Sequence, residues 1–451
     1  MAKVQTCALG MRIYINFPPR SKDLSMSVSF QRAGWIADSN IYEVNLRQYT
    51  PEGSFNAFSR EMPRLKDMGI DILWFMPITP ISLEKRKGSL GSYYACSDYL
   101  SVNPEFGNME DFKQLVKRAH ELGLRVIIDW VANHTGWDHH WTREHPEYYR
   151  KNQDGHFFEA HGWEDVIDLN YDNPELRRAM VEAMSWWLRE CDIDGYRCDM
   201  AMLVPLDFWR EARTELDKLK KDLFWLAECE EIAYHEVFDA TYTWKFLHKM
   251  EAVWRKESGL DGLDEVLSYY GSMFPPDAIR VFFTSNHDEN SHSGSEYERM
   301  GNAARAFAVL CATWNGMPMI YSGQELPNYK RLRFFEKDPI AWTGQCELHG
   351  FYKTLLECRR RNPALKGGDP AITTRRISTG ENWRCFGFVR CVGAHEVLVL
   401  LNISGDPLRV PAGDLQLAGV FREIFTGAEI DVASVGQIEI EPWGYRVFEK
   451  K

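Results

Sequence analysis

The feature that most constrains the fold of this chain is a repeated alternation of apolar runs with helix-like stretches. Eight short apolar segments are typical of strands, at residues 41–49, 72–78, 125–131, 196–200, 223–229, 240–244, 279–285 and 317–322. Between several of them lie segments with apolar residues at helical spacing, at 56–68, 108–122, 174–190 and 206–219. Strands with near-continuous apolar runs that alternate with helices are typical of a parallel barrel. The sequence therefore predicts an α/β fold built on a (β/α)8 TIM barrel over residues 41–365.

Three departures from this alternation define the predicted domains. Residues 1–40 show no readable element, and we expect them to be an N-terminal extension. The polar and aromatic stretch 134–173 is too long for an ordinary loop and predicts a small domain inserted after the third strand. From residue 366 onward, short strands are separated by turns with no helix between them. This predicts a C-terminal antiparallel β-sandwich domain at 366–451.

Composition narrows the classes of partner and compartment. The formal net charge of −12 argues against nucleic-acid binding, and no apolar run approaches the ~18–20 residues that span a bilayer. The ten cysteines form no CxxC pair, and several lie in apolar stretches, which favours reduced thiols. No secretory leader is visible, so we expect a cytoplasmic protein, or a secreted or periplasmic one if a leader was removed. The oligomeric state stays open.

Polar residues end four of the predicted strands, at the carboxyl ends where such barrels place their active sites. These residues are Asp129, Asn133 and His134, then Arg197 and Asp199, then Glu228, and finally Asn286, His287 and Asp288. A single strand-end acid is often only a helix cap. Three acids from three strand ends, together with an arginine and two histidines, predict one converged site.

Two carboxyl groups supported by a third acid suit the cleavage of glycosidic bonds, in which one carboxylate attacks and one carboxylic acid donates a proton. In retaining enzymes the two groups lie ~5–5.5 Å apart. Arg197 stands two residues before Asp199, on the same strand face, and predicts an ionised nucleophile of low pKa. A buried structural ion pair is the alternative for these two residues. The apolar run at 224–227 predicts a raised pKa and a proton-donor role for Glu228.

These segments resemble the signature regions of the α-amylase family, glycoside hydrolase family 13. The run from Asp129 to His134 is similar to the family's D-x-x-x-N-H region, and Gly195 to Asp199 is similar to its G-x-R-x-D region. Glu228 is similar to the single glutamate after the fifth strand, and residues 286–288 resemble the N-H-D region. The resemblance extends over about residues 41–451 and implies the same barrel with a C-terminal β domain.

The resemblance also implies a role for each site residue. It implies that Asp199 is the nucleophile, that Glu228 is the general acid and base, and that Asp288 stabilises the transition state. The implied substrate-binding residues, which would hold the reacting glucose, are Tyr94, His134, Arg197 and His287. For Tyr94, which would stack on the sugar, the alternative is a loop aromatic packed on its neighbour Tyr93.

Calcium-binding members of this family have a Lys-His pair shortly after the nucleophile, where this chain has Met200-Ala201-Met202. Asn133 and Asp168 remain as candidate oxygen ligands for a structural calcium ion. Because the Lys-His pair is missing, we assign no metal ligand and expect no required cofactor. The adjacent His139 and His140 have no spaced partner and predict surface or glycan-contacting residues rather than a metal site.

The function expected from these observations is that of a retaining α-glycosidase of α-amylase type. It would hydrolyse α-1,4-glucosidic bonds in starch, maltodextrin or related α-glucans, so the expected partner is an α-glucan or oligosaccharide. An α-glucan transglycosylase or a trehalose-synthase-like isomerase is the alternative, since both share the acids and differ in whether water reaches the intermediate. A non-catalytic glycan-binding scaffold is more remote, because all three acids are present. No G-x-S-x-G, phosphate-loop or H-E-x-x-H motif supports esterase, nucleotide or metalloprotease chemistry.

Overall fold

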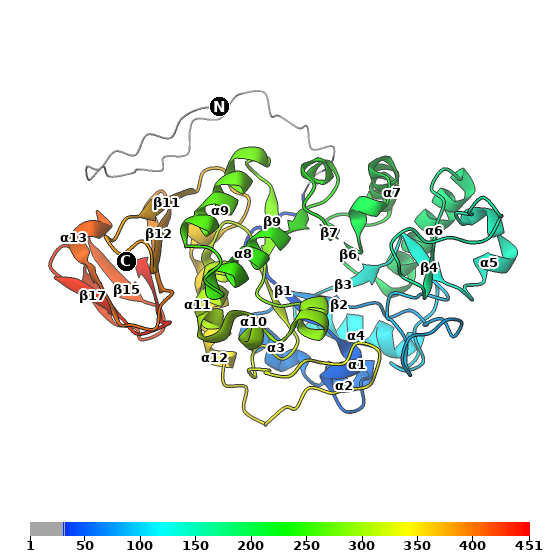
Figure 1. Ribbon diagram of the computed structural model, residues 1–451, viewed down its shortest axis with the longest axis horizontal. Coiled ribbons are helices and arrows are strands. Elements are labelled where there is room, and N and C mark those ends of the chain that lie inside the picture. The colour runs from blue at the N-terminus through cyan, green and yellow to red at the C-terminus, as the bar shows by residue number, and fades with distance from the viewer. Residues whose placement is uncertain (1–29, 31) are drawn as a thin grey trace.

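The computed structural model describes residue 30 and residues 32–451, and its larger part is a closed barrel of eight parallel strands (Figure 1). The barrel strands are β1 (Ile41–Val44), β2 (Ile72–Phe75), β3 (Arg125–Trp130), β6 (Gly195–Cys198), β7 (Phe224–Ala227), β8 (Ala240–Tyr242), β9 (Ile279–Phe282) and β10 (Met317–Tyr321). Around the ring they follow the order β1-β10-β9-β8-β7-β6-β3-β2. The predicted TIM barrel is confirmed. Most of the predicted extension 1–40 lies outside the described residues.

Helices surround the barrel and bury one apolar face each. They are α1 (Leu46–Tyr49), α2 (Phe55–Ser59), α3 (Met62–Met68), α4 (Met109–Glu121), α6 (Pro174–Cys191), α7 (Leu206–Leu219), α8 (Trp244–Trp254), α9 (Asp261–Met273), α10 (Glu296–Met300), α11 (Ala304–Thr313) and α12 (His349–Arg361). Helix α4 is typical: a reciprocal capping box between Asn108 and Asp111 begins it, and its inner face buries Phe112, Leu115 and Val116. Among the described helices, none combines the length and apolarity needed to cross a membrane.

The first strand is shorter than the alternation at 41–49 predicts. Strand β1 ends at Val44, and the following residues form the short helix α1. The alternation of apolar and polar residues predicts a longer strand because it assumes that the polar residues are exposed. Arg47 and Gln48 are instead buried and donate hydrogen bonds to carbonyl groups of distant loops. Asn45 likewise donates from its amide nitrogen to the Tyr321 hydroxyl at 2.8 Å. The turn after β1 is therefore held by tertiary contacts that the local pattern does not contain.

The segment inserted after β3 contains a small antiparallel pair, β4 (His134–Gly136) and β5 (Val166–Asp168), and the short helix α5 (Trp141–Glu144). It lies at the right-hand side of the barrel in Figure 1. His134 pairs with Asp168 in this ladder, so the hairpin fixes the position of His134 at the barrel mouth.

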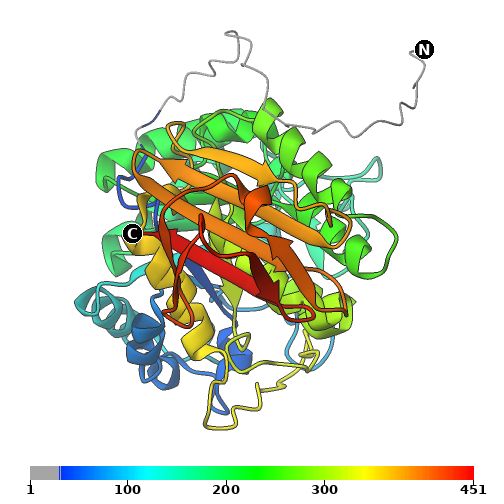
Figure 2. The same cartoon turned by 90° about the vertical axis from the view of Figure 1, so that its left-hand side faces the viewer.

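The C-terminal part is a six-stranded antiparallel sheet whose two faces are both covered (Figure 2). Its strands run in the order β11 (Thr373–Ile377), β12 (Cys385–Val392), β13 (His395–Asn402), β18 (Tyr445–Lys450), β15 (Val420–Glu423) and β16 (Glu429–Asp431). On β13, Val397 and Val399 pack in the core shared with the barrel helices. Leu398 and Leu400 point the other way, against the two-stranded sheet of β14 (Leu408–Pro411) and β17 (Gln437–Ile440), which the short helix α13 (Ala412–Leu415) connects in part. The predicted β-sandwich is confirmed, with one face of its larger sheet buried against the barrel.

Candidate active site

The carboxyl ends of the barrel strands enclose a pocket of about 420 Å³, within the usual size of small-molecule sites. Five of the seven residues predicted from sequence line it: Tyr94, His134, Asp199, Glu228 and Asp288. The other two, Arg197 and His287, are buried beneath its surface. The structure therefore brings the predicted acids together. It places two basic side chains, those of Arg197 and His287, directly behind them.

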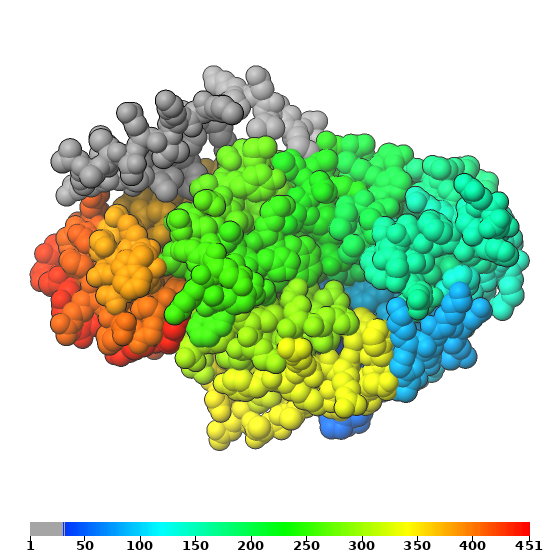
Figure 3. All heavy atoms as spheres, viewed as in Figure 1, coloured from blue at the N-terminus to red at the C-terminus, as the bar shows by residue number. Residues whose placement is uncertain are grey.

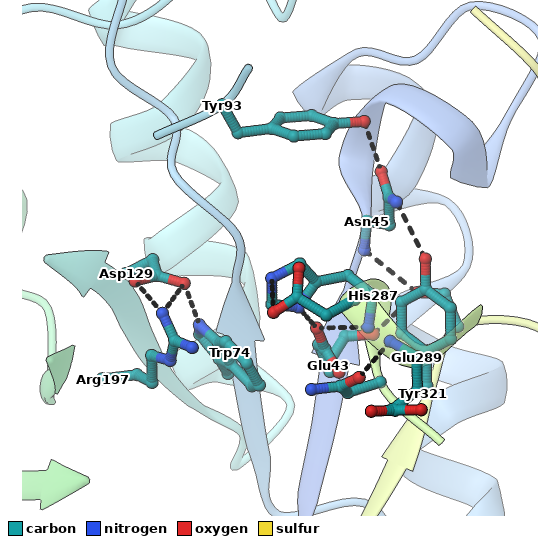
Figure 4. Close-up of polar contacts among 12 residues, drawn as sticks. Glu43, Asn45, Trp74, Tyr93, Asp129, Arg197, His287, Glu289 and Tyr321 are labelled. Atoms are coloured by element: carbon teal, nitrogen blue, oxygen red, sulfur yellow. Dashed lines mark hydrogen bonds and ion pairs between the residues drawn. The ribbon is translucent and has the colours of Figure 1, made fainter. Parts of the chain in front are cut away.

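A single guanidinium, that of Arg197, contacts three acidic side chains below the pocket. Figure 4 shows its contact with one of them, Asp129. Its Nη1 donates to Asp199 Oδ1 and to Asp129 Oδ1, each at 2.8 Å. Its Nη2 lies 2.8 Å from Glu228 Oε2, close enough for an ion pair although not aligned for a hydrogen bond. Trp74 packs 4.9 Å from the guanidinium carbon and closes the site from below. Because an unpaired buried charge is very costly, the arginine and the carboxylates stabilise one another in this position.

The close approach of β6 and β7 sets the two central acids side by side. At Gly195 φ is +149°, and a Cβ there would lie 1.9 Å from a backbone carbonyl oxygen of β7, so only glycine fits. The two strands are paired in parallel register, with Cys198 opposite Ala227. Asp199 and Glu228 are the next residues on each strand. The register therefore positions both carboxyl groups over the same guanidinium.

Burial dominates the electrostatics of these acids. It raises the pKa of Asp199 and of Glu228 to about 7, and that of Asp129 to about 6, while Arg197 opposes the rise. The predicted rise for Glu228 is confirmed. The predicted low pKa for Asp199 is wrong, because burial raises this pKa and the opposing Arg197 is shared with Asp129 and Glu228. Asp129, Asp199 and Glu228 together therefore keep a proton near neutral pH.

His287 lies between two carboxylates and next to a pocket tyrosine. Its Nδ1 is 2.5 Å from Glu43 Oε1, and its Nε2 is 3.4 Å from Asp288 Oδ2 and 2.6 Å from the Tyr94 hydroxyl. Burial lowers the pKa of the imidazole, but Asp288 and Glu43 outweigh it and raise this pKa to about 9. As a cation, His287 donates to the Tyr94 hydroxyl, which in turn donates to Asp129 Oδ2 at 3.1 Å. This chain of contacts connects β1, β9 and β3 across the barrel mouth.

Asp288 is the most exposed of the three predicted acids, since 41% of its side chain is accessible against 8% for Asp199 and 5% for Glu228. It immediately precedes a short π-helix, η4 (Glu289–Ser293), an element that often occurs at functional sites. Through this turn His292 also lines the pocket, with its ring 5.1 Å from that of Phe334. Asp288 therefore extends into the pocket space, above the floor formed by the other two acids.

Tyr94, His134 and Trp163 form further parts of the lining. The ring of Tyr94 lies nearly parallel to that of His287, at 5.4 Å, whereas Tyr93 turns away and donates its hydroxyl to Asn45 at 3.0 Å (Figure 4). The ring of Tyr94 therefore packs on His287 and not on Tyr93, which was the alternative. Burial lowers the pKa of His134 to about 4, so this side chain is neutral at pH 7. The ring of Trp163 lies 5.4 Å from it.

Comparison with known proteins agrees with this geometry. The family model described as the catalytic domain of alpha-amylase matches residues 29–165 and 148–333, which is more than half of the chain. The chain belongs to the α-amylase family. Alpha-amylase MalA of Haloarcula japonica is 28% identical over 405 residues, which cover 85% of this chain and 58% of that protein. The chain thus spans less than two thirds of that relative's length.

Two solved α-amylase structures share the whole architecture. The alpha-amylase from Lactobacillus plantarum matches with a TM-score of 0.84 and 28% identity, covering 92% of this chain and 99% of that one. The maltogenic alpha-amylase AmyB from Thermotoga neapolitana matches with a TM-score of 0.82 and 28% identity, covering 92% and 98%. The similarity therefore extends beyond the barrel to the C-terminal sheet.

The two candidate calcium ligands, Asn133 and Asp168, make different contacts. Asp168 Oδ1 is buried without a hydrogen-bond partner, but the amide nitrogen of Asn133 faces His134 at 3.2 Å. Within the described residues, no group of three or more His, Cys, Asp or Glu side chains is arranged to hold a metal ion. His139, expected at the surface, is instead fully buried and packs on Trp141, because the inserted segment folds over it.

Several pocket residues were not assigned from sequence. Asp129 belongs to a recognised sequence motif, but no role was assigned to it. Glu43 lies in the predicted strand at 41–49, where an acidic residue among buried neighbours was the signal that could have indicated its role. Lys87, Asp165 and Phe334 come from loops and carry no local signal of their position in the pocket.

The charge of His287 gives a direct test of the electrostatics. In Glu43→Gln, the amide keeps the size of the side chain but removes one of the two carboxylates that favour the imidazolium. The pKa of His287 should therefore fall from about 9 toward or below the ordinary histidine value. NMR titration of the His287 ring protons measures it, with Glu52→Gln at the exposed surface as a control that leaves it unchanged. A value that stays near 9 in Glu43→Gln would contradict the account.

Proposed function

We propose that this chain is a retaining hydrolase of α-1,4-glucosidic bonds in maltodextrins or related α-glucans. The observation that carries the proposal is the position of Asp199 and Glu228 on adjacent nitrogens of one buried guanidinium, facing a pocket of sugar size. Two carboxyls held this closely suit the short separation of retaining enzymes, ~5–5.5 Å, rather than the longer one that admits a water between them. The names of the related proteins, α-amylase and maltogenic α-amylase, support the same substrate class.

In the first step, a carboxylate oxygen of Asp199 attacks the anomeric carbon of the sugar in the pocket. The bond from that carbon to the glycosidic oxygen breaks, and Glu228 gives its proton to the departing oxygen. The products are a shortened glucan and a glycosyl ester on Asp199.

In the second step, Glu228, now ionised, removes a proton from a water molecule, which attacks the same carbon. The ester bond to Asp199 breaks, and the sugar leaves with its original anomeric configuration. If a sugar hydroxyl replaced water, the same two residues would perform transglycosylation, so the product mixture distinguishes the two reactions.

The different contacts of the two carboxyls suit these roles. They share one proton near neutral pH, because burial raises the pKa of both and their charges repel. Asp199 accepts an aligned, charge-assisted hydrogen bond from Arg197 Nη1, which favours its ionised form. Glu228 makes a less well aligned contact with Nη2 and accepts a weaker bond from the backbone nitrogen of Met200 at 3.0 Å. The shared proton therefore resides on Glu228.

The remaining pocket residues bind the sugar on which these steps act. Asp288, the acid that extends farthest into the pocket, would accept hydrogen bonds from sugar hydroxyls and stabilise the positive charge that develops on the ring. Tyr94 would offer its ring face, and the neutral His134 would donate or accept a hydrogen bond. Arg197 and His287 act from beneath by holding these groups in place. Segment 134–173 contributes His134 to the pocket, which supports treating it as an inserted domain.

A time course with maltoheptaose tests the proposal. Proton NMR of freshly formed products should show the α-anomer first, together with sugars shorter than the substrate by chromatography. Products longer than seven glucose units would indicate transglycosylation instead of hydrolysis. An isomer of the substrate, formed with no change in the number of chains, would indicate isomerisation. No reaction at all would contradict the proposed activity.

The proposed role of Glu228 as general acid can be tested separately, with two substrates whose leaving groups differ in their need for a proton. In Glu228→Gln, cleavage of maltoheptaose should fall by at least about 100-fold, since a general acid contributes on the order of 10²–10⁴. Cleavage of α-glucosyl fluoride should fall much less, because fluoride leaves without a proton. Steady-state kinetics on both substrates measures the difference. Equal losses on the two substrates would assign the acid to another residue.

A further inference from the structure

The position of Glu228 sets the direction in which a substrate chain lies. The proton it donates goes to the oxygen of the leaving sugar, so the leaving chain lies on the β7 side of the pocket. The rest of the substrate, which ends in the non-reducing terminus, extends away from β7. In the barrel ring, β1 is four strands from β7 in either direction and is flanked by β10 and β2. The non-reducing side of the substrate therefore points toward the loops that follow β10 and β2.

These two loops form one continuous layer. The β2 loop (residues 83–92) and the β10 loop (residues 328–340) are joined by a backbone hydrogen bond from Leu90 to the Phe335 carbonyl, at 3.0 Å. The backbone nitrogen of Ser89 donates to Glu336 Oε1 at 2.9 Å. Their contact is tight, because a Cβ on Gly88 would lie 2.5 Å from Phe335 Cβ. Figure 3 shows the yellow β10 loop beside the blue β2 loop.

A buried arginine in α1, just after β1, holds both loops. Arg47 is fully buried, and its Nη1 donates to the carbonyl oxygens of Gly91, at 3.1 Å, and Phe334, at 3.3 Å. Its charge is paired with Glu105 at 2.8 Å. Because one side chain serves both loops, neither loop moves away from the pocket without breaking a buried, charge-assisted contact.

The inner surface of this layer is aromatic. Phe334 lines the pocket, with its ring nearly parallel to that of Tyr94 at an interplanar angle of 14° and a centroid distance of 6.3 Å. Phe335 also belongs to the lining. A sugar stacked at Tyr94 would therefore meet Phe334 and Phe335 where its next neighbour toward the non-reducing end would lie.

An ion pair extends the barrier to the inserted segment. Lys87 of the β2 loop lies 2.7 Å, Nζ to Oδ1, from Asp165, and both residues line the pocket. The side chain of Asp165 is 7% exposed and that of Lys87 is 38% exposed, so water screens this pair from the lysine side only. These contacts thus link the β10 loop through the β2 loop to the segment after β3. We refer to this linked layer as the Lys87–Phe334 wall.

We propose that the Lys87–Phe334 wall closes the non-reducing side of the pocket, so that the enzyme cleaves glucans from their non-reducing ends and not internally. This inference rests on the proposed hydrolytic function and adds the mode of attack to it. The wall admits the terminal sugars of a chain and rejects a chain that continues beyond them. Lys87 and Phe334 are then specificity-determining residues of the proposed reaction.

The test compares maltoheptaose with maltoheptaose whose non-reducing end carries a 4,6-O-benzylidene group. The wild-type enzyme should cleave the blocked substrate with kcat/KM lower by at least about 100-fold, because the block cannot enter the closed side. Similar rates on both substrates would show internal cleavage and overturn the inference while leaving the hydrolytic function intact. Failure to cleave even the unblocked substrate would overturn the proposed function and the inference with it.

Substitutions in the Lys87–Phe334 wall test whether the wall causes this difference between the two substrates. Lys87→Ala removes the ion pair to Asp165 and should raise the ratio of blocked to unblocked cleavage by about tenfold. Phe334→Ala, which opens the other part of the wall, should act in the same direction. Lys85→Ala is the matched control, since this lysine of the same loop lies over the Trp137 ring and does not line the pocket. An unchanged ratio in both Lys87→Ala and Phe334→Ala would contradict the assignment.

Discussion

The active-site arrangement depends on one buried cation. Arg197 has no access to solvent, and its charge is balanced by Asp129, Asp199 and Glu228, which come from three different strands. Removing Arg197 would leave three buried carboxylates without their common cation, in a medium that solvates charge poorly. The register of β3, β6 and β7 is therefore coupled to the electrostatics of the pocket floor. Burial of these acids, together with the excess of carboxylates over cations, raises the pKa of Asp199 and of Glu228 to about 7.

A second cation, His287, completes the arrangement on the opposite side. Its contacts with Glu43, Asp288 and Tyr94 join the floor to the side of the pocket where the sugar ring would lie. The two cations differ in what they hold. Arg197 positions the groups that would exchange a proton and form the ester, while His287 positions the groups that would bind the sugar.

Much of this arrangement is predictable from the sequence, and the reasons are physical. The barrel follows from apolar runs alternating with amphipathic helices, because each element must bury one face, and the acids follow from their places at strand ends. The low pKa predicted for Asp199 is wrong because the sequence shows the neighbouring Arg197, but neither the burial of the carboxyl group nor the other two acids that share the arginine. The end of β1 is likewise missed, since the buried polar side chains of Arg47 and Gln48 find their partners in distant loops. The Lys87–Phe334 wall is beyond local patterns for the same reason: the contacts between its β2 and β10 loops join residues separated by more than two hundred positions.

The central claim is that Asp199 forms a covalent bond to the sugar, and trapping that bond tests it most directly. A 5-fluoroglucosyl fluoride of the α-configuration has a good leaving group, while its second fluorine slows the hydrolysis of the ester. Mass spectrometry of the treated protein should show one added fluoroglucosyl group, and peptide sequencing should place it on Asp199. The label should be absent from Asp199→Asn. A label on any other residue of the wild-type enzyme, or turnover of this reagent at an unchanged rate by Asp199→Asn, would contradict the account.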